Sequence, residues 1–209
     1  MSKIVTNLIL ERRDKTGKVL EHREQESRSW VLHMIQMLYL MSGYNSNSLT
    51  NIHDITVTNR NLDTLKSANL QVASPPGDSI TVPQGGLSGQ GIFIPGHNVG
   101  IVVGSGVPTP APNDDALLTP ITHGRKSGQL LYSGTELYGL TFVNPNGSFT
   151  IQRYYTNHSG GNVTVNEVAI YCVGQNAYSF CIYHDAVSPG IAIADTQLLV
   201  AQIIPGITV

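Results

Sequence analysis

Residues 155–171 have the sequence YTNHSGGNVTVNEVAIY, and this stretch decides the expected fold. Tyr, Thr, Val and Ile, which fit a pleated and half-buried surface, lie on both sides of the turn-forming Ser159-Gly-Gly-Asn162. The pattern predicts two strands joined as a β-hairpin. A second turn, Asn144-Pro-Asn-Gly147, precedes it, so we expect an antiparallel meander over about residues 135–185.

The rest of the chain after residue 51 repeats this pattern of short β-rich runs separated by turns. The expected strands are 55–58, 70–73, 80–82, 92–94 and 99–103, then, after a Pro-rich loop, 129–132, 136–143, 148–155, 163–172, 179–184, 190–194 and 198–204. This spacing predicts a mainly β fold, an antiparallel β-sandwich of jelly-roll type. No segment after Gly43 has a helical period, which argues against a parallel α/β fold.

The N-terminal part has a different organisation. Residues 4–11 and 18–24 predict a β-hairpin around Gly17. Ser27 or Ser29 can cap a helix that runs from Trp30 to Met41 and ends at Gly43. Its polar stripe is narrow, so we expect this short helix to be buried on nearly all sides.

One main domain with an N-terminal arm is therefore expected. Residues 1–50 form a hairpin plus helix, an anchoring arm packed on the main domain, and residues 51–209 form the β-sandwich. One face of the helix is expected to line an interface, with Trp30, Met34, Leu38 and Met41. Glu167, a charge in a strand almost free of charges, is expected in an intersubunit contact or in bracing a turn.

Charge is scarce and unevenly distributed. Charged residues make up 12% of the chain, about half of the roughly 25% that is usual, and the net charge of −2 disfavours nucleic acid as a partner. Residues 3–28 hold seven Lys or Arg and five Asp or Glu. We expect a solvated hairpin there, and the alternative is an arm that docks on a charged partner.

The sequence predicts a protein that folds in the cytoplasm and does not cross a membrane. The first residues lack the apolar core of a secretory signal, and the apolar run from Trp30 to Met41 is only 12 residues long, too short for a bilayer. Cys172 and Cys181 flank a turn. We expect them to be reduced, because cytosolic folding disfavours disulfides and two cysteines alone make no metal framework.

No set of residues predicts catalysis, and we expect no cofactor. Gly104-Ser-Gly106 lacks the lysine and the helix start of a phosphate-binding loop. Asp114-Asp115 could help to hold Ca²⁺, which needs six or more oxygens, but a turn is the simpler interpretation. The seven histidines are scattered, and His184-Asp185 has no nucleophile with it.

Aromatic residues concentrate in the C-terminal half of the chain. Cross-strand packing explains such residues in most sheets. The alternative is a stacking platform for a glycan, with Arg153 as a polar contact.

Several segments together resemble structural proteins of tailed bacteriophages. They are GIVVGSG at 100–106, DDALLTPI at 114–121, YTNHSG at 155–160, VTVNEVAIY at 163–171, and NLILERRDKTG at 7–17 with Ser-Trp-Val at 29–31. The resemblance implies a virion component with a β-sandwich body, often trimeric, folded in the host cytoplasm. The expected function is non-enzymatic: capsid decoration or a minor capsid protein that binds itself and the major capsid or other virion proteins. The alternative is a tail, neck or fibre component that binds a host surface glycan.

Overall fold

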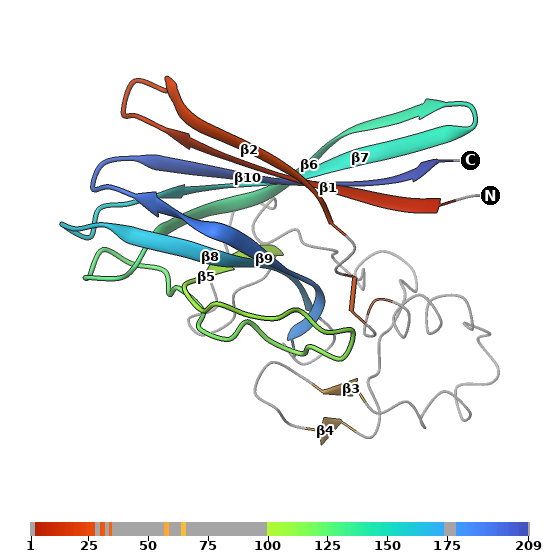
Figure 1. Ribbon diagram of the computed structural model, residues 1–209, viewed down its shortest axis with the longest axis horizontal. Coiled ribbons are helices and arrows are strands. Elements are labelled where there is room, and N and C mark those ends of the chain that lie inside the picture. Colours follow the sequence, from red (N-terminus) through yellow and green to blue (C-terminus); the bar gives the residue numbers. More distant parts are fainter. Residues whose placement is uncertain are drawn as a thin grey trace, which may run out of the picture.

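The computed structural model describes residues 3–27, 30–31, 34, 57–58, 64–65, 100–173 and 179–208. These residues form ten strands (Figure 1): β1 (Lys3–Arg13), β2 (Val19–Ser27), β3 (Val57–Thr58), β4 (Thr64–Leu65), β5 (Gly100–Gly104), β6 (Leu131–Val143), β7 (Asn146–Thr156), β8 (Val163–Val173), β9 (Ser179–Ile193) and β10 (Leu198–Thr208). The predicted strands at 70–73, 80–82 and 92–94 lie outside the described residues. The others are confirmed, with 129–132 and 136–143 merged into β6, and 179–184 and 190–194 merged into β9.

All strand pairs are antiparallel, so the predicted mainly β, antiparallel architecture is confirmed. A five-stranded sheet has the order β2-β1-β10-β7-β6, a three-stranded sheet has the order β5-β8-β9, and β3 pairs with β4. The three-stranded sheet lies across one face of the five-stranded sheet (Figure 1). That face is called the inner face below.

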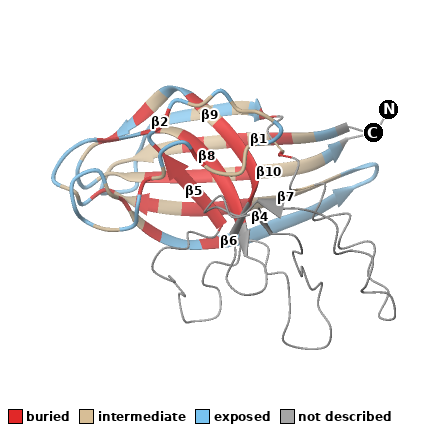
Figure 2. Cartoon of the chain, turned by 90° about the horizontal axis from the view of Figure 1, so that it is seen from below, coloured by how far each residue is buried: buried red, intermediate tan, exposed pale blue. Residues whose placement is uncertain are grey.

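The two sheets share one hydrophobic core (Figure 2). Alternate side chains of a strand point to one face, and the alternate residues Leu199, Ala201 and Ile203 of β10 are all buried in this core. Strand β5 is buried along its whole length although it is an edge strand. The loop after it covers its open side, with Ile121 N donating to Val103 O at 3.0 Å, which keeps this apolar edge from other chains.

The predicted hairpin over residues 155–171 is wrong in one respect, because the turn at Ser159–Asn162 carries the chain from one sheet to the other. Strand β7 pairs with β6 and β10, while β8 pairs with β5 and β9. Both edges of β7 are thus paired with β6 and β10, which leaves no edge for β8 to pair with. Asn157, fully buried, holds the crossing: its Nδ2 donates to Gly161 O and Ile193 O, both at 2.7 Å. The meander over 135–185 is limited to β6–β7 and β8–β9.

The N-terminal hairpin is confirmed, and β1 is an internal strand of the five-stranded sheet, between β2 and β10. Leu8 and Leu10 of β1 are buried in the common core. The hairpin is thus continuous with the C-terminal strand. The boundary expected at residue 50 lies outside the described residues.

The expected helix does not begin at Ser27 or include Trp30 in its first turn. Ser27 ends β2, and Trp30 forms an isolated antiparallel bridge with Tyr183. Val31 N donates to Ile182 O at 3.2 Å, so this segment is held against β9. Met34 is the described residue of the range from Trp30 to Met41 that has helical geometry, and its N donates to Val31 O at 3.0 Å. The expected helix is otherwise not seen, because most of this range lies outside the described residues. In the part of the chain that is described, we find no helix of membrane-spanning length and hydrophobicity.

Candidate functional site

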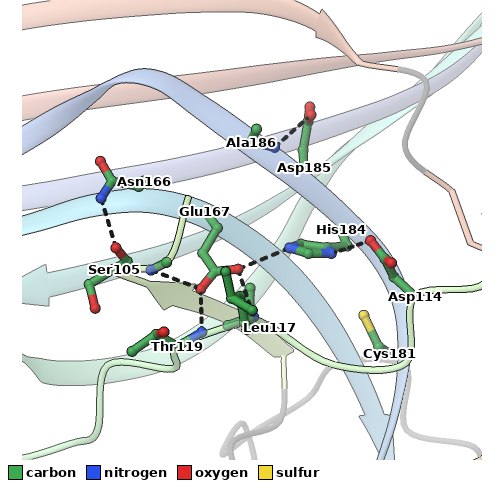
Figure 3. Close-up of polar contacts among 12 residues, drawn as sticks. Ser105, Asp114, Leu117, Thr119, Asn166, Glu167, Cys181, His184, Asp185 and Ala186 are labelled. Carbon is green, nitrogen blue, oxygen red and sulfur yellow. Dashed lines mark hydrogen bonds and ion pairs between the residues drawn. The ribbon is translucent and has the colours of Figure 1, made fainter. Parts of the chain in front are cut away.

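A concentrated polar cluster lies around Glu167 of β8, whose side chain has no exposed surface. Its carboxylate accepts four hydrogen bonds (Figure 3). Oε1 accepts from Gly106 N at 3.1 Å and Thr119 N at 2.7 Å, and Oε2 accepts from Leu118 N at 2.9 Å and His184 Nε2 at 3.1 Å. Three amides of the loop between β5 and β6 therefore surround one internal carboxylate. Glu167 was expected either in an intersubunit contact or in bracing a turn, and the contacts described within the chain brace this loop.

Two glycines let the loop approach this carboxylate. A Cβ atom on Gly104 would collide with the Glu167 side chain, and one on Gly106 would lie 2.8 Å from Oε1. Glycine permits a close approach of backbone to a ligand, and the ligand here belongs to the chain itself. The Gly104-Ser-Gly106 sequence thus serves an internal carboxylate.

His184 extends the cluster from Glu167 to the loop residue Asp114. Its Nδ1 lies 2.7 Å from Asp114 Oδ2, and its side chain is 3% exposed. Asp114 Oδ2 also accepts from Ala111 N at 2.9 Å. The register places Ala169 opposite His184 and Ala186 opposite Glu167, so His184 and Glu167 are diagonal neighbours on one face of the β8–β9 pair.

The contacts of the pair shift both pKa values toward the charged forms. Burial opposes the imidazolium, but the hydrogen bonds to Glu167 and Asp114 outweigh it and raise the pKa of His184. Burial also opposes the Glu167 carboxylate, but the hydrogen bonds from His184, Thr119 and Leu118 outweigh it and lower its pKa. A charged histidine that donates to two carboxylates is the arrangement that these directions favour.

This cluster is suited to bracing and poorly suited to catalysis. A general base must keep a ring nitrogen available for the proton that it removes. Both ring nitrogens of His184 face carboxylates instead. Within the described ranges, no group of three or more His, Cys, Asp or Glu is arranged to hold a metal ion.

Asp185 belongs to a separate network that ties the N-terminal hairpin to β9. Gln25 Nε2 donates to Asp185 Oδ2 at 3.1 Å, and the Tyr183 hydroxyl lies 2.9 Å from Ser27 Oγ and 3.2 Å from Asp185 Oδ2. The charged residues of β1 and β2 mostly pair with one another, as in Glu11 with His22 and Arg12 with Glu21.

Arg153, expected as a polar contact on a glycan platform, lies inside the protein. It is 2% exposed, and it donates to Ser133 O and Ile101 O, both at 2.8 Å. Tyr155, Tyr171 and Tyr183 are also buried. Four of the eight aromatic residues whose side chains are described between Tyr132 and Tyr183 are thus buried in the core, whereas Tyr138 and Phe142 are exposed.

The residues expected at an interface are in different surroundings. Trp30 and Met34 are partly buried against the core, and Trp30 Nε1 donates to Thr6 Oγ1 at 2.7 Å. Leu38 and Met41 lie outside the described residues.

Of the two cysteines, Cys181 lies opposite Tyr171 in the strand register. The Sγ atom of Cys181 is buried, 3.3 Å from Tyr183 O. The Cys172 side chain is not among those described.

A second candidate site was missed from the sequence. At one end of the five-stranded sheet, a concavity of about 560 Å³ is lined by Ile4, Leu140, Phe142, Phe149, Pro205 and Ile207, among others. Phe142 is 80% exposed and Leu140 is 69% exposed. The available signal was the charge-free sequence from Leu137 to Gln152, which was interpreted only as strand and turn.

Comparison with protein-family models, curated proteins and solved structures gives no match to this chain.

Proposed function

We propose that this chain is a non-enzymatic structural protein of a tailed-phage virion, a capsid decoration, auxiliary or minor capsid protein. It acts by self-association, with a trimer favoured, and by docking on the major capsid or other virion proteins. Its body is a β-sandwich of jelly-roll type, an interpretation supported by two antiparallel sheets that share one core.

One observation carries the proposal: segments on which the phage resemblance rests meet around Glu167. Strand β5 pairs with β8, and the loop residues Leu118 and Thr119 donate to the Glu167 carboxylate. Three of the segments that carry the resemblance, 100–106, 114–121 and 163–171, therefore form one structural unit, a loop braced on a sheet. Polar side chains in this unit satisfy the backbone, as expected in a rigid building block.

Mass spectrometry of purified phage particles tests this function. We expect the chain in particles at a fixed copy number relative to the major capsid protein, and an antibody against it should label the capsid in electron micrographs. Detection of the chain in infected cells but not in purified particles would overturn the proposal. Variants for tests of particle incorporation should carry point substitutions. A deletion of residues 1–43 is unsuitable, because it would remove the internal strand β1 from the five-stranded sheet.

A second candidate function is a glycan-binding module of a tail, neck or fibre. It is favoured by Tyr138, 44% exposed, whose hydroxyl lies 2.8 Å from Gln152 Oε1 and accepts from Gln202 Nε2 at 2.9 Å. The exposed ring beside the partly exposed Gln202 amide suits a sugar ring and its hydroxyls, while the buried Gln152 holds both in place.

A glycan array with host-surface sugars tests this alternative. Binding that is lost in Tyr138→Ala and kept in Tyr132→Phe, a change at a buried tyrosine, would support it. The absence of binding by the unmodified chain would eliminate it, and label at the tail tip would favour it over a capsid position.

A further inference from the structure

The inner face of the five-stranded sheet stays apolar beyond the part that the second sheet covers. In β10, Leu199, Ala201 and Ile203 are buried in the core. Pro205 and Ile207 continue the same alternation on the same face. The ends of β1, β6, β7 and β10 extend past the three-stranded sheet (Figure 1), so the face that builds the core becomes exposed there.

Strand register aligns the exposed side chains into a row. Phe142 of β6 lies opposite Gly147 of β7, Gly147 lies opposite Ile207 of β10, and Ile207 lies opposite Ile4 of β1. Ile4 is 65% exposed and Ile207 is 52% exposed. We call this row, together with Leu140, Phe149 and Pro205 beside it, the apolar end.

The apolar end has both a projection and a hollow. The Phe142 ring lies over Gly147, where a Cβ would come within 3.0 Å of it, and the hollow beside the ring is the concavity of about 560 Å³ that Leu140 and Ile207 help to line. The ring itself remains 80% exposed. A hollow beside a projecting ring is a shape that the ring of a second copy can enter, and a contact of this kind repeated around a three-fold axis closes into a trimer.

Charge distribution also favours a second copy as the occupant. Residues 137–152 and 196–209 contain no Asp, Glu, Lys or Arg. Two such surfaces can meet without repulsion between like charges. A charged partner would meet no charged side chain of opposite sign in these segments.

The exposed area approaches the size that an interface requires. The exposed parts of Ile4, Leu140, Phe142 and Ile207 amount to on the order of 550 Å², against roughly 800 Å² per partner in a standard interface. Soluble monomers rarely expose a contiguous apolar patch larger than a few hundred Å². We infer that the apolar end is the surface through which this chain binds a second copy of itself, which rests on the self-association in the proposed function.

Sedimentation equilibrium of the purified chain and its variants tests the surface. The wild-type chain should sediment as an oligomer, and Phe142→Asp should weaken self-association at least about thirtyfold, the effect of an interface hot spot. Val107→Asp is the matched control, because Val107 is also 80% exposed but lies in the loop after β5. It should associate like the wild type. Leu140→Asn serves as the second variant if Phe142→Asp does not fold by circular dichroism.

Two results would overturn the inference. If the wild-type chain is monomeric at all concentrations, the apolar end does not bind a second copy. A folded Phe142→Asp variant that associates like the wild type places the interface elsewhere. Neither result depends on phage particles, and a chain that is absent from particles but associates through Phe142 would reject the virion role and leave this surface standing.

Discussion

The braced loop and the apolar end show two opposite uses of the same β scaffold. Around Glu167, one buried carboxylate accepts hydrogen bonds from three loop amides and a histidine. At the apolar end, Phe142 and Leu140 are mostly exposed, and the sequence from Leu137 to Gln152 carries no charge. The first region uses polar groups to fix the chain, and the second leaves apolar groups without a cover. Stability should therefore depend on the first region and association on the second.

Glu167→Gln should have the largest effect on stability. The neutral amide turns a donor toward backbone N–H groups and leaves Asp114 as the carboxylate partner of His184, so the loss should be about 2 to 4 kcal/mol, between that of an unsatisfied buried group and that of an unpaired buried charge. Urea unfolding measures the loss. Glu136→Gln, an exposed position on β6, should change the free energy of unfolding by less than about 0.5 kcal/mol. Equal effects of the two variants would remove the distinction between the brace and the surface.

Gly104→Ala should have the next largest effect. Its methyl group would collide with the Glu167 side chain, and overpacking of this kind costs about 1 to 3 kcal/mol. Gly161→Ala is the control, because a Cβ at Gly161 meets no atom within 4 Å. Thermal unfolding should show a lower Tm for Gly104→Ala alone, and an unchanged Tm would mean that the loop does not need this close approach.

The change of stability with pH should be smaller than the effects of these two substitutions, and stability should fall at both acid and alkaline pH. The pKa of His184 is raised above its ordinary 6.5, so its contribution is full below pH 6.5 and is lost as pH rises through the raised pKa. The pKa of Glu167 is lowered below its ordinary 4.5, so its contribution is full above pH 4.5 and is lost as pH falls through the lowered pKa.

Urea unfolding between pH 4 and 9 measures this dependence. The pair's contribution should be greatest between about pH 4.5 and 6.5, the ordinary pKa values of its two members. His184→Gln should remove most of the loss on the alkaline side. A wild-type chain that becomes more stable from pH 6.5 to 8 would contradict the charged pair.

Phe142→Asp should have the smallest effect on folding. The side chain is largely in solvent in one chain, so the free energy of unfolding of the monomer should change by less than about 0.5 kcal/mol. Urea unfolding at low protein concentration measures it. A loss above 2 kcal/mol would mean that Phe142 packs within its own chain.

Much of the fold was predictable because strand periodicity and turn residues are local properties. Strand β7 and the Asn144–Gly147 turn appear in the sequence almost as they appear in the structure. The crossing after Thr156 was not predictable. A Gly-Gly turn between two β-rich runs is compatible with a hairpin and with a change of sheet, and the choice depends on β10, which pairs with β7 from the far end of the chain.

The cluster around Glu167 was predictable only in parts. Asp114, Glu167 and His184 each stood out from the sequence, but they are separated by 53 and 17 positions. Their meeting depends on how the loop folds back on β5. The apolar end gave a weaker signal, because alternating apolar residues look the same in a covered strand and in one that projects beyond its sheet.

Hydrogen exchange of the wild-type chain, measured across the concentration range of self-association, tests the central distinction most directly. Amides of Gly106, Leu118 and Thr119 should be protected at every concentration, because the buried Glu167 accepts their hydrogen bonds within one chain. Amides of residues 137–149 should gain protection as the concentration rises. Protection of residues 137–149 that does not change with concentration, or rapid exchange at all three amides that bind Glu167, would contradict the account.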